Sequence, residues 1–138
     1  MKVNVKLGDT SSYTRTVSES DVYIYAGITA DVNKLSLNKD FCEKNNTTQR
    51  VQNSYILGLI SASLGAEMPG FGTIYLGQEI EYLNPAYIGD TLTIKCEVDE
   101  LLDKKKFIIA NIKTTCVNQK NEIIAEGKAT AIPPMVRQ

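Results

Sequence analysis

The chain contains no histidine and no tryptophan among its 138 residues. The lack of histidine excludes the most, because Ser/His/Asp and Cys/His nucleophilic sites, histidine general bases and most catalytic zinc sites all need an imidazole ring. The chain also lacks the GxxxxGK[ST] phosphate loop and a GxGxxG loop between a strand and a helix. Any catalysis by this protein must therefore rely on carboxylate, lysine, tyrosine or backbone groups.

Cysteine is scarce, and no charge of one sign accumulates. The three cysteines, Cys42, Cys96 and Cys116, are an odd number without CxxC spacing, which is typical of reduced thiols in the cytoplasm and argues against a zinc site. Fifteen basic and sixteen acidic residues give a formal net charge of -1. The longest run of one sign, "KKK" at 104–106, is interpreted as part of a hairpin turn, so we expect no nucleic-acid-binding surface.

Long apolar runs are absent as well. The start, "MKVNVKLGD", alternates polar and apolar residues and has no apolar core of signal-peptide length. The longest nearly apolar run, "YILGLISASLGA" from Tyr55 to Ala66, is shorter than the roughly 18 to 20 residues that a membrane span needs. We expect one domain over residues 1–138 and no membrane segment.

Helical signals occupy the first half of the chain. Ser18 followed by Asp21 resembles a capping box and predicts a helix from about Glu19 to Ile28. A short helical turn is expected around Lys39 to Glu43. A longer, buried helix is predicted over roughly 51–67, and "PG" at Pro69 and Gly70 ends it. Its small residues, among them Gly58 and Gly65, are interpreted as positions where a sheet or another helix comes close.

The second half of the chain alternates with the period of strands. The stretch "GTIYLGQEIEYL" predicts one core face made of Ile74, Leu76, Ile80 and Tyr82, and "DTLTIKCEVDEL" predicts another made of Leu92, Ile94, Cys96 and Val98. Two more strands follow in "KFIIANIKTTCV" and "EIIAEGKATAI", joined by the turn "NQKNE". With one strand near the N-terminus, the order predicts an α+β protein, a long antiparallel sheet wrapped around one buried central helix, as in the hotdog fold.

Two motifs in this half carry a family resemblance. PGxGxIYLxQ begins at Pro69, one residue before the stretch "GFGTIYLGQEIEYLNPAYIGDTLTIKCEV" from Gly70 to Val98, and PxxxGDxL begins within it at Pro85. This stretch is similar to the R-specific enoyl-CoA hydratases, the MaoC-like dehydratases of the hotdog class. "TADVNKLSLN" and "LISASLGAEMPG" agree with the same family in order and spacing. The resemblance covers almost the whole chain and implies R-specific hydration of 2-enoyl thioesters, or the reverse dehydration.

The same resemblance implies a catalytic loop of the approximate form DxNPxHxD, in which the aspartate and the histidine jointly bind the attacking water. Asp31 and Asn33 match this loop. Three positions differ, since Lys34 replaces the proline, Ser36 the histidine and Asn38 the second acid. A serine hydroxyl can hold water but is not a base near pH 7. Asp31 is therefore the predicted base, with Ser36 and Asn33 positioning water.

A structural role for these residues is the alternative. Aspartate and asparagine commonly cap short helices and shape turns, so Asp31, Asn33 and Asn38 also fit a loop without catalysis.

A second departure lies at the start of the buried helix. The family has histidine and then glycine there, and the glycine N–H donates to the thioester oxygen. Counting back from "MPG" places Gln52 and Asn53 on these positions, whereas counting forward from Phe41 places Asn53 and Ser54 there. Each of the three keeps its backbone N–H, so Gln52, Asn53 and Ser54 are the predicted oxyanion and substrate-binding residues. The side chain of Asn53 adds bulk where the family leaves room.

Three functions fit these residues. The first is an R-specific hydratase or dehydratase of thioesters of coenzyme A or acyl carrier protein. The second is a thioesterase, in which Asp31 activates water for attack on the thioester carbonyl. The third is a non-catalytic acyl-thioester-binding subunit. None of them needs a cofactor. A lone hotdog domain leaves a sheet edge open, so we also expect a homodimer through the strand "TIYLGQEIEY".

Overall fold

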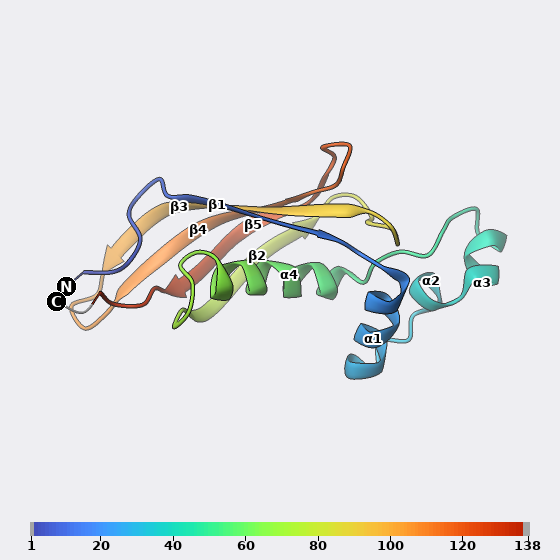
Figure 1. Ribbon diagram of the computed structural model, residues 1–138, viewed down its shortest axis with the longest axis horizontal. Coiled ribbons are helices and arrows are strands. Elements are labelled where there is room, and N and C mark those ends of the chain that lie inside the picture. The colour runs from blue at the N-terminus through green and yellow to red at the C-terminus, as the bar shows by residue number, and fades with distance from the viewer. Residues whose placement is uncertain (1, 137–138) are drawn as a thin grey trace.

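The computed structural model describes residues 2–136 and has a five-stranded antiparallel sheet with one long helix along its concave face (Figure 1). The strands are β1 (Thr10–Thr16), β2 (Ile74–Tyr82), β3 (Thr91–Asp103), β4 (Ile108–Val117) and β5 (Ile123–Ile132), in the spatial order β1-β3-β4-β5-β2. The helix is α4 (Asn53–Ala66). This is the α+β hotdog architecture that the sequence predicts.

Helix α4 buries one side against the sheet. Ile56, Ile60 and Leu64 are spaced four residues apart, share one face of the helix and are at most 1% exposed. Gly58 lies on the opposite, exposed side, and a Cβ added to Gly58 or Gly65 would meet no atom within 4 Å. The expectation that these glycines admit the sheet was therefore wrong, because Gly58 faces away from the sheet and neither glycine is in close contact with it. Within residues 2–136, no helix is long and apolar enough to cross a membrane.

The core faces of the strands were predicted correctly for β3 but only in part for β2. Leu92, Ile94, Cys96 and Val98 are all buried. In β2, by contrast, Ile74 and Leu76 are 56% and 51% exposed, while Ile80 and Tyr82 pack against the core. The pairing of β2 with β5 shifts between Tyr75 and Gly77. Such an irregularity adds one residue to the strand and reverses the alternation on either side of it.

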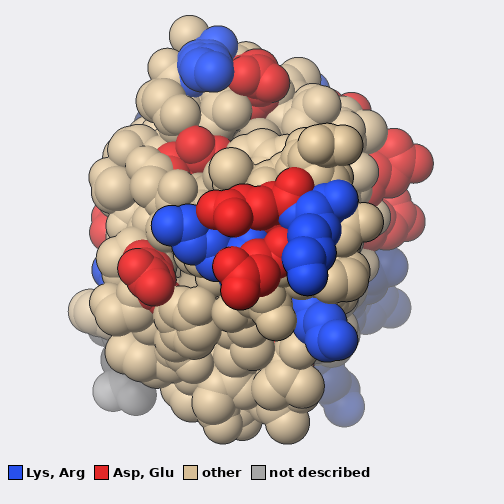
Figure 2. Space-filling view, turned by 90° about the vertical axis from the view of Figure 1, so that its right-hand side faces the viewer, with Lys and Arg blue, Asp and Glu red and all other residues tan. Residues whose placement is uncertain are grey.

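The remaining helices form the end of the molecule beyond the N-terminus of α4 (Figure 1). They are α1 (Glu19–Thr29), α2 (Lys34–Leu37) and α3 (Lys39–Lys44), of which α2 was not predicted. The capping box of α1 is confirmed, since Asp21 N–H donates to Ser18 Oγ at 3.1 Å and Ser18 N–H donates to Asp21 Oδ2 at 3.0 Å. On this end of the molecule, acidic and basic side chains lie interspersed (Figure 2).

A glycine that the fold does require is Gly127 in β5, which pairs with Ile80 of β2. A Cβ at this position would overlap the carbonyl oxygen of Glu79, which accepts a hydrogen bond of 2.8 Å from Gln78 Nε2. We expect Gly127→Ala to destabilise the protein by about 3 kcal/mol or more, because the backbone of β2 must move. Gly77→Ala is the control, since a Cβ there meets nothing within 4 Å. Equal urea midpoints for the two variants would contradict this packing.

Candidate active site

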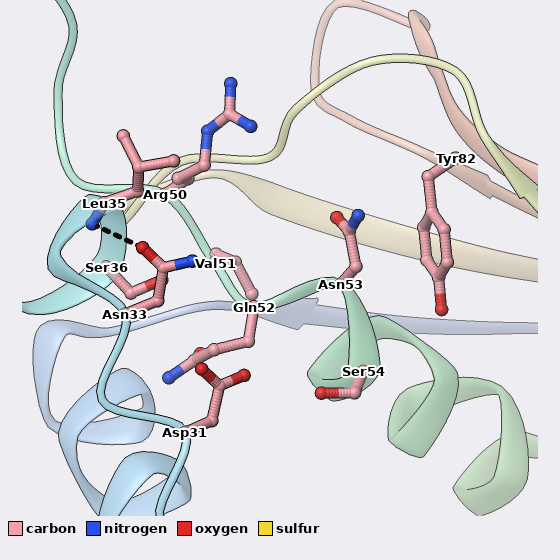
Figure 3. Close-up of a pocket in the computed structure, with 10 residues that line it drawn as sticks. All are labelled: Asp31, Asn33, Leu35, Ser36, Arg50, Val51, Gln52, Asn53, Ser54 and Tyr82. Atoms are coloured by element: carbon pink, nitrogen blue, oxygen red, sulfur yellow. Dashed lines mark hydrogen bonds between the residues drawn. The ribbon is translucent and has the colours of Figure 1, made fainter. Parts of the chain in front are cut away.

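A cavity of about 410 Å³ opens at the N-terminal end of α4 (Figure 3). The loop after α1, helix α2, the residues that lead into α4 and the end of β2 enclose it. It is lined by Asp31, Asn33, Leu35, Ser36, Arg50, Val51, Gln52, Asn53, Ser54 and Tyr82. All six residues that the sequence suggested for catalysis or binding therefore lie around one space, although they come from two separate segments of the chain.

Asp31 presents a free carboxylate to this cavity. The residue follows Ala30, whose left-handed backbone (φ 61°) ends α1, and its own N–H donates to Thr29 Oγ1 at 3.2 Å. Within residues 2–136 the carboxylate forms neither a hydrogen bond nor an ion pair and points toward Gln52 (Figure 3). Asp31 caps no helix, so its charge is available to accept a proton.

The two asparagines of the loop do act as helix caps. Asn33 Oδ1 accepts the N–H of Leu35 at 2.9 Å and begins α2, while Asn38 Oδ1 accepts the N–H of Phe41 at 2.9 Å and begins α3. Asn33 still lines the cavity, whereas Asn38 does not. Helix capping thus holds for the oxygen atoms of both asparagines, whereas Asp31 caps none of the helices within residues 2–136.

Ser36 is held firmly at the wall of the cavity. It lies in α2, is 3% exposed, and its carbonyl accepts a hydrogen bond from Gln49 Nε2 at 2.8 Å. Ser36 lines the same cavity as Asn33 and Asp31. This places a small polar side chain at the position for which the family pattern has an imidazole.

Gln52 joins the two segments of the site. Its Nε2 donates to the carbonyl of Val22 in α1 at 2.9 Å, which ties the start of α4 to α1. Its Oε1 is buried and has no hydrogen-bond partner among residues 2–136. A buried acceptor without a donor is costly, and a ligand hydroxyl or a water molecule can supply that donor.

The N-terminus of α4 is open toward the cavity. The helix begins at Asn53, with Ser54 next. In the described part of the chain no side chain caps it, since the amide of Gln52 is turned toward α1. The first N–H groups of a helix have no partner within the helix and lie at the positive end of its dipole. Asn53 and Ser54 therefore offer backbone donors to a developing negative charge.

Two lining residues with polar ends were missed by the sequence analysis, Arg50 and Tyr82. Burial, and next the neighbouring Tyr25, raises the pKa of Tyr82, so its phenol stays protonated at neutral pH. The alternation of β2 assigned Tyr82 to the core only. Arg50 carried a clearer signal, because it is the only charged residue between Lys44 and Glu67. A lone charge just before a buried helix is a candidate for function.

Fold and cavity together define a hotdog protein with a carboxylate opposite the N-terminus of its central helix. A model of the MaoC-like domain matches residues 5–121, so the chain belongs to the MaoC-like dehydratase family.

Named relatives agree with this assignment. An (R)-specific enoyl-CoA hydratase of Rhodospirillum rubrum is 36% identical over 95% of this chain and 90% of that protein. A mitochondrial 3-hydroxyacyl-[acyl-carrier-protein] dehydratase of Solanum lycopersicum is 29% identical over 94% and 78%. Among solved structures, the unliganded R-hydratase PhaJ1 of Pseudomonas aeruginosa superimposes with a TM-score of 0.89 at 28% identity, over 96% of this chain and 84% of that one.

Proposed function

We propose that this protein adds water to 2-enoyl thioesters to form (R)-3-hydroxyacyl thioesters, and catalyses the reverse dehydration. The thioester carrier is coenzyme A or acyl carrier protein, as in the names of the relatives. The observation that carries the proposal is the unpaired carboxylate of Asp31 in the same cavity as the uncapped N-terminus of α4. Hydration needs both features, a base for water and a donor for the thioester oxygen.

The proposed steps follow from this arrangement. Asp31 accepts a proton from water while the water oxygen bonds to C3 of the enoyl group. The electrons of the C2–C3 double bond move to the thioester oxygen, where the N–H of Asn53 or Ser54 stabilises the enolate. Asp31 then returns the proton to C2 and regains its charge. Ser36 and the amide nitrogen of Asn33 hold the water by hydrogen bonds. Gln52 Oε1 accepts a hydrogen bond from the second O–H of the water.

The lack of an imidazole group determines the hydration rate that we expect. General acid/base assistance is worth about 10² to 10⁴ in rate, and Asp31 has to provide all of it in this chain. We therefore expect a slow hydratase in comparison with family members that have the histidine.

An assay of the purified protein with short and medium 2-enoyl-CoA substrates tests the proposal. Loss of the enoyl absorbance with formation of 3-hydroxyacyl-CoA supports hydration. Release of free thiol would instead support a thioesterase. Thermal stabilisation by acyl-CoA with no product at all would support a non-catalytic binding subunit.

Dimer formation is a further expectation from the sheet edge. Strand β2 is an outer strand, and it exposes Ile74 and Leu76 beside unpaired backbone groups. Open apolar edges favour pairing with another chain. We expect sedimentation at micromolar concentration to give a homodimer, and Leu76→Lys to shift it toward monomer. A monodisperse monomer of the unmodified protein would refute this assembly.

A further inference from the structure

The cavity contains one charged side chain for which hydration provides no task, Arg50. Its backbone N–H donates to the carbonyl of Leu35 at 2.9 Å, which holds it beside α2. Its side chain extends away from Asp31, Gln52 and Ser54, at the upper side of the view in Figure 3. Arg50, Asp31 and the start of α4 thus lie on three different sides of the cavity.

The guanidinium of Arg50 is not neutralised by a carboxylate. Within residues 2–136 it forms no ion pair, and its Nε is buried without a hydrogen-bond partner. Arg15 differs, since it is paired with Asp21 at 2.9 Å. A half-buried cation without a counter-charge gains from a ligand that supplies acceptors in place of water.

We propose that Arg50 binds a carboxylate at the far end of the substrate's acyl group, so that the preferred substrates are thioesters of dicarboxylic acids. This inference rests on the proposed function for the position of the thioester at the N-terminus of α4. The phosphates of the carrier lie at the far end of its pantetheine arm, outside a cavity of about 410 Å³. An anion that reaches Arg50 inside the cavity therefore belongs to the acyl group. Guanidinium and carboxylate form two parallel hydrogen bonds, which gives strong selectivity.

A binding experiment isolates this contact. Valeryl-CoA and glutaryl-CoA are saturated and differ only in a terminal methyl or carboxylate. We expect the unmodified protein to bind glutaryl-CoA about 10- to 100-fold more tightly, as for a hydrogen bond between charged groups. Arg50→Met should remove this preference while valeryl-CoA still binds, and Arg50→Lys should keep part of it. Lys106→Met, in the exposed turn between β3 and β4, removes the same charge elsewhere and should change nothing.

Equal affinity of the unmodified protein for the two thioesters would overturn the proposal. The proposal would also be overturned if Arg50→Met lowered the affinity for both CoA thioesters alike but left the affinity for valeryl-pantetheine unchanged. Arg50 would then bind a phosphate of the carrier. Turnover separates this inference from the proposed function. Hydration of 2-pentenoyl-CoA without preference for glutaconyl-CoA refutes only the role of Arg50. Retained binding preference without any hydration refutes only the hydratase.

Discussion

Replacing Asp31 with asparagine is expected to lower hydration of 2-enoyl thioesters by at least about 10² to 10⁴, because the variant loses the only group assigned to proton transfer. Asparagine has nearly the same shape as aspartate. The carboxylate makes no hydrogen bond or ion pair within residues 2–136, so the fold and its stability should not change. Steady-state rates and thermal unfolding of the same preparations measure the two effects separately.

Asp40→Asn is the matched control for this experiment. Asp40 lies in α3, is exposed and does not line the cavity. The Asp40→Asn variant should hydrate 2-enoyl thioesters as fast as the unmodified protein. If Asp31→Asn is equally fast, the loop after α1 is only a turn, and the catalytic role of Asp31 is refuted.

Ser36→His is expected to raise the rate, by up to about 10² to 10⁴ if acid/base help from imidazole is what the site lacks. Ser36 stands at the position that the family resemblance assigns to histidine, and it lines the cavity together with Asp31. Asn53, at the start of α4, has more bulk than the glycine of the family pattern and leaves less room for the thioester in the same cavity. The gain should therefore be larger in Ser36→His combined with Asn53→Gly than the two single effects predict, because both groups act on one transition state.

Ser12→His provides the control, since Ser12 is exposed on β1 and does not line the cavity. Asn53→Gly alone should keep its backbone N–H and bind thioesters at least as well. A Ser36→His variant that folds, binds acyl-CoA and hydrates no faster would show that the missing histidine does not limit this site.

The sequence predicts much of this site because its motifs keep their spacing. Asp31 and Asn33 lie two residues apart in one loop, and Gln52, Asn53 and Ser54 occupy the start of the helix that "MPG" ends. Helix α4 itself begins at Asn53, close to the predicted start at about residue 51. Local signals of this kind depend on neighbours along the chain, so they survive without knowledge of the tertiary structure.

Other features depend on contacts between distant segments. The register shift between Tyr75 and Gly77 arises where β2 pairs with β5. The alternation of apolar residues in β2 alone does not predict it. Gly58 was assigned to the sheet because α4 is apolar nearly all round, yet the larger Ile56 and Ile60 determine which side turns inward. Tyr82 enters the cavity only because the end of β2 lies across from the start of α4.

The stereochemistry of hydration tests the central claim most directly. If Asp31 alone takes the proton from water and returns it to C2, oxygen and hydrogen must add to the same face of the double bond. Crotonyl-CoA hydrated in D₂O should then yield (R)-3-hydroxybutyryl-CoA with deuterium at C2 in a single configuration, that of syn addition, as read by NMR and chiral chromatography. Deuterium in the anti configuration, or in both, would contradict the account and require a second proton donor on the opposite face.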